Sequence, residues 1–344
     1  MRKPLAHTAL FMVGLLGTAA LIRTIDPLPF WSYGRRKVAH LAEHLDDYDT
    51  LFFGSSRVVN GIVPGVFDAR MAQLGRSSRS FNAAVAASKP HDFDNVIDWV
   101  LAQDPQRLRR VFIELHSYEQ VIADGQSMTD LVIEAHTPAT FWPRVQSVMI
   151  SHRTGRQKLQ QVWDIAQHTI VNGLRIGQGP RIARDLLDRW RALPPAGYGP
   201  MLHAGFVEIG PEKAAEERLR THREWVSAPA EAADMLDAKR AELVPQRLHG
   251  GFNFAAFHAQ RNRLLQAGIE VNYIVMPNYS NWFRGRDALD ELRETACILE
   301  LDRPLDFAPL FTFELWFDAS HVLRPGAYAI SFVLADEYDK AHDR

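Results

Sequence analysis

Thr50-Leu-Phe-Phe-Gly-Ser-Ser56 is the stretch of sequence that decides the fold. Its first four residues form a short apolar run that ends at Gly54, which is the pattern of a buried strand followed by a sharp turn. Two small hydroxyl residues, Ser55 and Ser56, come directly after this strand. In an open α/β sheet, reactive groups gather in the loops beyond the carboxyl ends of the strands. The stretch therefore predicts a first strand and a loop that presents serine hydroxyls to a cleft.

Short apolar runs recur along the chain at wide spacing. We predict further strands at residues 80–84, 110–115, 270–276 and 304–307. Helices are predicted at residues 34–44, 64–74, 92–101, 254–267 and 325–339. Because strands that alternate with helices form a parallel sheet covered on both faces, we expect an α/β fold. Five strands at this spacing suit a doubly wound, flavodoxin-like sheet.

The alternation of strands and helices stops between about residues 123 and 251. Amphipathic helices are predicted there at residues 156–169 and 181–193, followed by the loop Leu193-Pro-Pro-Ala-Gly-Tyr-Gly-Pro200. We interpret this segment as a helical insertion that caps the sheet, and not as an independent domain. Residues 25–344 are then expected to form one α/β domain.

Residues 1–24 have the composition of a membrane anchor. After the basic start Met1-Arg-Lys3, the run from Leu5 to Ile22 carries no formal charge and is just long enough to cross a bilayer as a helix. A cleaved secretory signal and a buried helix of a soluble protein share this composition. An uncleaved anchor is favoured because the run lacks a clear small-x-small cleavage site followed by a polar start. We therefore expect a single-pass membrane protein.

Charge and cysteine content exclude several classes of function. Lys and Arg (39) nearly balance Asp and Glu (41), so we expect no nucleic-acid partner, which would need a basic face. The single cysteine, Cys297, rules out an internal disulfide and a thiolate metal cluster, and its apolar neighbours indicate a small core residue. His40 and His44 lack a third metal ligand, and the sequence holds no Walker phosphate-binding motif. Neither a metal nor a cofactor is expected.

A second polar group, Asp318-Ala-Ser-His321, lies shortly before the last predicted helix. A serine is a weak nucleophile until a base accepts its proton, and that base must be oriented by a third group. The two groups together predict a catalytic triad in which Ser56 is the nucleophile, His321 the base and Asp318 the orienting acid. In the structural alternative, the serines only cap the next helix, Asp318 is a turn residue and His321 a surface residue.

These residues resemble the sequence blocks of the SGNH/GDSL-type serine esterases and acyltransferases. Members of that superfamily carry Gly-Asp-Ser after the first strand and Asp-x-x-His before the last helix. Gly54-Ser55-Ser56 is similar to the first block, with Ser55 where the family usually has Asp, and Asp318 and His321 match the last block.

Residues 53–62 resemble a membrane-anchored branch of this superfamily from the bacterial envelope, which includes DltD-like and alginate O-acetylation-like proteins. The resemblance covers about residues 48–118 and 252–340. It implies a serine esterase or O-acyltransferase that acts on a cell-envelope polysaccharide or other polymer. Together with the apolar run near the start of the chain, it predicts a position in the inner membrane with the domain in the periplasm.

The oxyanion hole is where the sequence departs from the family. The family uses a Gly and an Asn of its second and third blocks, whereas this chain has Ala84 and His116 in those regions. Asn82 is the best side-chain donor, beside a backbone N–H near Ala84, and Ser55 and Arg57 are further candidates for oxyanion or substrate binding. In the structural alternative, Asn82 satisfies loop backbone, His116 is a half-buried histidine and Arg57 pairs with a carboxylate. Loss of one oxyanion donor costs about 10²–10³ in rate, so a second hypothesis is a catalytically inactive accessory subunit that binds the polymer or a membrane-bound acyltransferase.

Overall fold

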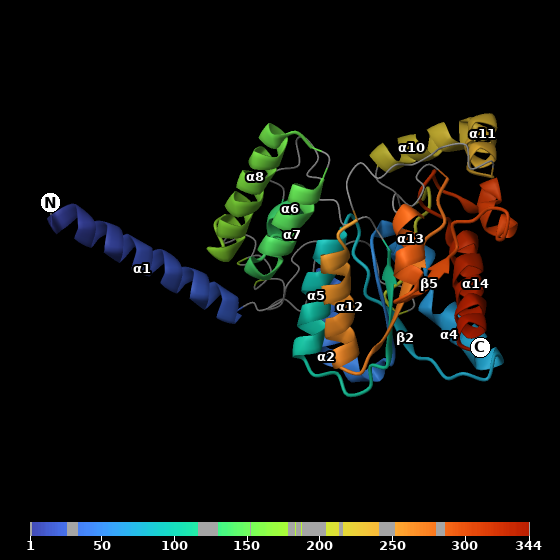
Figure 1. Cartoon of the computed structure of the whole chain (residues 1–344), viewed down its shortest axis with the longest axis horizontal. Coiled ribbons are helices and arrows are strands. Elements are labelled where there is room, and N and C mark those ends of the chain that lie inside the picture. Colours follow the sequence, from blue (N-terminus) through green and yellow to red (C-terminus); the bar gives the residue numbers. More distant parts are fainter. Residues whose placement is uncertain are drawn as a thin grey trace.

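The computed structural model of the chain describes residues 2–25, 34–115, 130–151, 153–177, 204–212, 216–240, 252–279 and 286–343, together with residues 183 and 187. Five parallel strands form one sheet in the order β2-β1-β3-β4-β5 (Figure 1). The strands are β1 (Thr50–Phe53), β2 (Ser80–Asn82), β3 (Arg110–Glu114), β4 (Glu270–Val275) and β5 (Cys297–Glu300). The predicted α/β fold with a five-stranded parallel sheet is therefore confirmed.

Side chains of the strands alternate between two hydrophobic cores, one on each face of the sheet. In β1, Leu51 and Phe53 belong to one core and Phe52 to the other, and all three are buried. In parallel register, Phe52 pairs with Phe112 of β3, and their stacked ring centroids lie 5.1 Å apart. Burial on both faces explains why the first strand is a continuous apolar run.

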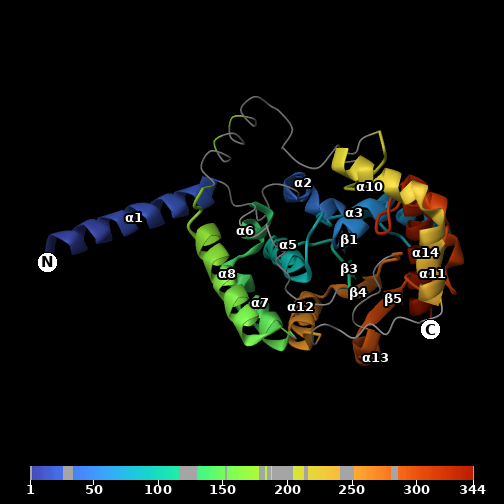
Figure 2. The same ribbon diagram turned by 90° about the horizontal axis from the view of Figure 1, so that it is seen from above.

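Helices cover both faces of the sheet (Figures 1 and 2). One core is closed by α2 (Arg35–His44), α5 (Pro90–Ala102), α12 (Phe254–Gln266) and α13 (Arg286–Arg293). The other core is closed by α3 (Ser56–Gly61), α4 (Pro64–Gln73) and α14 (Arg324–His342). Short 3-10 helices lie at Leu45–Asp47, Ala308–Phe311 and Phe313–Leu315. The five helices predicted around the strands correspond to α2, α4, α5, α12 and α14.

The fifth strand is not the segment predicted at residues 304–307. β5 comes earlier, at Cys297–Glu300, where it pairs with β4. Residues 304–306 form a turn, in which Arg303 Nε lies 2.8 Å from Asp306 Oδ2 and the Arg303 carbonyl accepts the N–H of Phe307 at 3.0 Å. Pro304 has no N–H to donate to a neighbouring strand. The prediction was wrong because the apolar stretch around Cys297 was interpreted as core without being assigned to a strand.

Between β3 and α12, the described residues form helices and no strand. The helices α6 (Asp130–Ala135), α7 (Pro138–Ile150) and α8 (Gly155–Gly173) lie on the side of α5, where buried Arg144 of α7 pairs with buried Asp92 (Figure 1). The helices α10 (Glu216–Ser227) and α11 (Pro229–Arg240) instead pack on the core that includes α14. The helix predicted at residues 156–169 corresponds to α8. The helix predicted at residues 181–193 lies outside the described residues, apart from residues 183 and 187.

The first helix, α1 (Arg2–Ile25), projects away from the α/β domain (Figures 1 and 2). Its segment Ala6–Thr24 is long and apolar enough to cross a membrane, and almost all of that segment is exposed. A core helix of a soluble protein would bury its apolar side chains. The exposure therefore argues against a buried helix, whereas an anchor and a signal sequence share these properties.

Candidate active site

The two serines after β1 have different positions in the turn that leads into α3. Ser55 is the N-cap of α3, and its Oγ accepts the N–H of Arg57 at 3.3 Å. Ser56 is the first residue of the helix. Capping thus explains Ser55, in agreement with the structural alternative for that residue. Ser56 has a different contact.

Ser56, His321 and Asp318 form one continuous chain of hydrogen-bond contacts. Ser56 Oγ lies 2.8 Å from His321 Nε2, and His321 Nδ1 lies 3.0 and 2.9 Å from Oδ1 and Oδ2 of Asp318. When Nδ1 is protonated, its N–H donates a hydrogen bond to the carboxylate, and Nε2 accepts a hydrogen bond from the Ser56 hydroxyl. The contact between Ser56 and His321 is short enough for a base to take the serine proton.

A tight turn before α14 holds Asp318 and His321 side by side. Trp316 and Val322 form an antiparallel bridge across its base. Within the turn, Asp318 Oδ1 accepts the backbone N–H of His321 at 2.9 Å. Gly326 at the start of α14 allows the helix to pack closely on this turn, since a Cβ there would lie 2.8 Å from the Cβ of Val322. Asp318 is therefore both a turn residue and the partner of the imidazole.

Hydrogen bonds favour the ionised form of Asp318. Burial acts to raise the pKa of this carboxyl, but the hydrogen bond and charge of His321, with the N–H groups of Ser320 and His321, outweigh burial and lower the pKa below its ordinary value. An ionised carboxylate holds the imidazole in one tautomer and stabilises the imidazolium that forms when His321 accepts a proton.

Glu114, the last residue of β3, belongs to the site but was missed by the sequence analysis. Its side chain is almost completely buried, Oε2 accepts the N–H of Ser55 at 2.6 Å, and Oε1 lies 2.7 Å from Arg57 Nε. A buried carboxylate needs such partners to offset the loss of water. The signal in the sequence is a charged residue inside an otherwise apolar run at residues 111–115. Arg57 thus pairs with a carboxylate, and Glu114 ties β3 to the loop that carries Ser56.

Asn82 is not placed to act as the predicted oxyanion donor. It is fully buried, and its Nδ2 donates to the carbonyl groups of Val58 and Ile62, each at 2.8 Å. Its Oδ1 accepts from Lys37 Nζ at 3.3 Å and from the N–H of Ala84 at 3.2 Å. Both amide hydrogens are used to hold α3 against β2, so none remains for an oxyanion. The prediction for Asn82 is corrected to a structural role.

The backbone N–H groups of Ala84 and Val85 are engaged as well. Ala84 donates to the side-chain oxygen described above, and Val85 donates to the carbonyl of Gly54 at 3.0 Å. Ser56 is the first residue of α3, where the N–H has no acceptor within the helix. The N–H of Ser56 is therefore open to an oxyanion on the substrate. His116 lies outside the described residues.

A buried lysine ties α2 to the end of β2. Lys37 Nζ donates to the carbonyl of Ala84 at 2.7 Å, in addition to its contact with Asn82. Burial lowers the pKa of this amine well below its ordinary value. Burying this amine costs its hydration, and its hydrogen bonds hold the segment after β2 in place.

The helix α10 covers the turn that carries Asp318. His222 Nδ1 lies 2.7 Å from the carbonyl oxygen of Phe317, and the two rings stack with centroids 4.5 Å apart. Trp225, one turn further along α10, stacks on Phe313 with ring centroids 5.0 Å apart. Part of the segment between β3 and α12 thus packs directly beside the candidate site.

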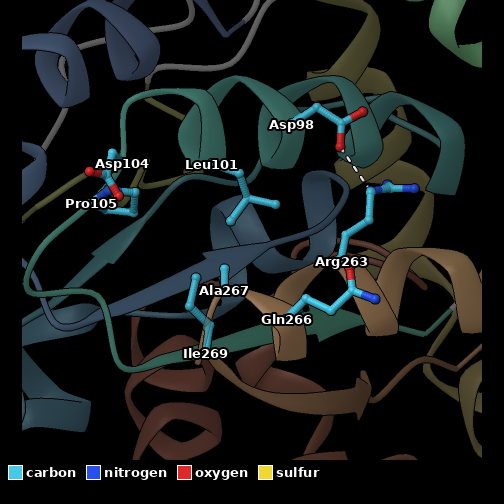
Figure 3. Close-up of a pocket in the computed structure, with 8 residues that line it drawn as sticks. All are labelled: Asp98, Leu101, Asp104, Pro105, Arg263, Gln266, Ala267 and Ile269. Atoms are coloured by element: carbon cyan, nitrogen blue, oxygen red, sulfur yellow. Dashed lines mark ion pairs between the residues drawn. The ribbon is translucent and has the colours of Figure 1, made fainter.

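A pocket lies between α5 and α12, near the amino end of β4 (Figure 3). It has a volume of about 490 Å³ and is lined by Asp98, Leu101, Asp104, Pro105, Arg263, Gln266, Ala267 and Ile269. These residues come from the carboxyl-terminal parts of α5 and α12 and from the loops that follow them, which precede β3 and β4, whereas Ser56 follows the end of β1. Arg263 Nε and Asp98 Oδ1 are paired at 3.0 Å. The pocket therefore does not serve the chemistry of Ser56.

In the part of the chain that the structure describes, neither a cluster of metal-ligating side chains nor a reactive thiol is found. No group of three or more His, Cys, Asp or Glu side chains there could hold a metal ion. His40 Nε2 instead lies 2.8 Å from the hydroxyl of Tyr48. Cys297 is half-buried in β5, and burial raises the pKa of its thiol to about 11, which keeps the thiol protonated.

No family model matches the sequence, and comparison with curated proteins finds no significant similarity.

Proposed function

We propose that the protein is a serine esterase or O-acyltransferase of the SGNH/GDSL type, with Ser56, His321 and Asp318 as its catalytic triad. The observation that carries the proposal is the chain of contacts from Ser56 Oγ to His321 Nε2 (2.8 Å) and from His321 Nδ1 to Asp318 (2.9 Å). Ser56 and His321 are 265 positions apart. Their contact therefore results from the fold and not from local chain geometry.

The reaction proceeds in two transfers. Ser56 Oγ attacks the carbonyl carbon of an ester or thioester while His321 Nε2 takes its proton, and Asp318 holds the resulting imidazolium. The leaving oxygen or sulfur receives that proton from His321, which leaves the acyl group on Ser56. An acceptor hydroxyl then loses its proton to His321 and attacks the acyl carbon, and Ser56 recovers its proton. Water as acceptor gives hydrolysis, and a polymer hydroxyl gives transfer.

The resemblance and the architecture together favour a long substrate from the cell envelope. We assign the domain to the doubly wound, flavodoxin-like class, and residues 123–251 to a helical insertion within it. The strand order and the position of Ser56 beyond β1 support the first assignment. The packing of α10 on the turn beside Asp318 supports the second. Such an insertion would border a groove for an envelope polysaccharide.

The inner membrane, with the domain in the periplasm, is the location that suits this activity. The exposed apolar helix α1 and the envelope branch that residues 53–62 resemble support it. Reporter fusions at the carboxyl terminus test the orientation. We expect an alkaline phosphatase fusion to be active and a cytoplasmic reporter to be silent, and the opposite result would reverse the topology.

Covalent labelling with a fluorophosphonate tests the triad. In detergent extract, the probe should modify Ser56, as read by mass spectrometry of the labelled peptide. Ser56→Ala and His321→Ala should each abolish labelling, and the double variant should be no worse than either single one, because members of a triad act as a unit. Ser55→Ala is the matched control and should keep most of the labelling. Labelling that depends on Ser55 and not on Ser56 would contradict the assignment of the nucleophile.

A catalytically inactive accessory subunit is the second candidate, and one observation favours it. Asn82 and Ala84, the expected oxyanion donors, both use their N–H groups within the fold. A protein of this kind would keep the fold and bind an envelope polymer or a membrane acyltransferase. It would not react with the probe, and Ser56→Ala would retain full function in the cell at normal protein levels.

A further inference from the structure

The helix α8 exposes apolar side chains and buries mostly polar ones. Leu159, Trp163 and Ile170 are 72%, 65% and 58% exposed. They are four and seven positions apart, so they lie on one face of the helix. The buried face consists of Gln161, Ile165, His168 and Asn172. A surface helix of a soluble domain would have the opposite arrangement.

Contacts on the buried face set the orientation of α8. Asn172 Nδ2 donates to the carbonyl groups of His136 and Glu134 at 2.9 and 3.3 Å. The ring of His168 packs edge-on against that of His136, with centroids 4.9 Å apart. Rotation of the helix would leave these buried polar groups without partners, at a large cost in free energy. The contacts of the buried polar face therefore fix the helix with its apolar face toward the outside of the domain.

The apolar face lies beside the helix that we propose to span the membrane. Arg23 Nη2, near the end of α1, donates to the carbonyl of Gly173, the last residue of α8, at 3.0 Å. In Figures 1 and 2, α8 is the outermost helix of its group on the side from which α1 projects, and it runs across the direction of α1. The surface of a bilayer crossed by α1 would therefore extend along α8.

We infer that α8 is a second membrane contact, which lies in the headgroup layer of the bilayer with Leu159, Trp163 and Ile170 turned toward the acyl chains. The inference rests on the proposed insertion of α1. Tryptophan is enriched at the boundary between membrane and water, and helices with an apolar face and basic residues bind anionic lipid surfaces. Arg156 and Lys158 in the first turns of α8 supply such charge.

A second contact has a consequence for the site. A single helix would leave the domain free to tilt about the end of α1. Contact of α8 with lipid adds a line of attachment across the direction of α1, so the domain keeps one orientation and Ser56 stays at one height above the bilayer. A membrane-bound donor of acyl groups would then always meet the same face of the domain.

Site-directed spin labelling of the full chain tests the contact. The protein is reconstituted in vesicles of phosphatidylethanolamine and phosphatidylglycerol, with Cys297 replaced by Ala and a single label at Leu159→Cys or Trp163→Cys. These labels should collide more often with oxygen, which concentrates in lipid, than with a water-soluble nickel complex. Leu305 is the matched control, because it is 73% exposed and lies in the turn after β5. β5 lies on the opposite side of the domain from α1 (Figure 1). Its label should prefer the nickel complex.

A further label at Leu16, in α1, separates the two ways of failing. A label at Leu16 that meets the nickel complex would show that α1 is not inserted, which removes the premise. A label at Leu16 in lipid, with labels at Leu159 and Trp163 that behave like the label at Leu305, would show that α8 faces water and that this inference alone is wrong. Labels on α8 that are shielded from both reagents would mean that a second copy of the protein covers the face, which also overturns the lipid contact.

Discussion

Gly54→Ala tests whether close packing behind the loop holds Ser56 in position. A Cβ at residue 54 would lie 2.4 Å from Cγ2 of Val58, and 2.8 and 2.9 Å from Oε2 and Cβ of Glu114. Non-bonded carbon atoms approach to about 3.5 Å, so Val58 would have to move by roughly 1 Å. Neither neighbour can yield easily, because both are buried and Glu114 accepts the N–H of Ser55.

The size of the effect follows from these contacts. Overpacking of a buried site costs about 1–3 kcal/mol. Replacing Gly by Ala also restricts the unfolded chain, which returns about 0.4–1 kcal/mol. We therefore expect the free energy of unfolding to fall by about 1–2 kcal/mol, which lowers the urea midpoint by about 0.5 M for a slope of about 3 kcal/mol/M. Displacement of a catalytic group by 1 Å can cost about 100-fold in rate, so labelling of Ser56 by a fluorophosphonate should slow by about that factor.

Gly65→Ala is the control for this experiment. Gly65 lies in α4, where a Cβ would have no neighbour within 4 Å. Its substitution should leave the urea midpoint unchanged or slightly higher, and labelling of Ser56 should keep the wild-type rate. If Gly54→Ala unfolds at the wild-type midpoint and labels at the wild-type rate, the packing argument is refuted.

Three further predictions concern charge. Glu114→Gln should lower the free energy of unfolding by about 1–3 kcal/mol, as measured in urea titrations, because the half-buried Arg57 loses its charged partner. An unchanged free energy of unfolding would mean that this ion pair does not stabilise the fold. Folding lowers the pKa of Asp318. The stability that its carboxylate contributes is therefore fully present above the pKa of the unfolded state and is lost as the pH falls through the pKa of the folded state. In Asp318→Asn, the decrease of the urea midpoint below about pH 4 should be smaller than in the wild type. Folding lowers the pKa of Lys37 below 10.5, so the unfolded state binds more protons between the two pKa values and stability rises with pH there. Lys37→Met should abolish that rise, and an unchanged slope would show that the amine stays fully protonated in the fold.

Local sequence patterns predicted a feature correctly where the residues of a single segment are enough to produce it. The apolar run Thr50–Phe53 indicated a strand buried on both faces, because four successive nonpolar or β-prone residues leave no side for water. The run at residues 5–22 indicated a helix that can cross a bilayer, because it carries no formal charge and is just long enough to do so. Asp318 and His321 are close in sequence, so a single turn can bring them together, and their spacing alone suggested the pair. Whether Ser56 is the nucleophile remains a prediction.

Only the tertiary structure decided which polar groups face one another across the sheet. The sequence placed Asn82 at the end of β2, but the packing of α3 against that strand uses both of its amide hydrogens. Glu114 has no local signature beyond a charge in an apolar run, and its partners come from the loop after β1. The fifth strand was misplaced because an apolar stretch such as the one around Cys297 fits a core segment as well as a strand, and only its pairing with β4 shows that it is a strand. By itself, the sequence determined which segments must be buried, since burial follows from the composition of each segment. The partners of the buried polar groups depend on contacts between residues far apart in the chain, and only the packed sheet determines those contacts.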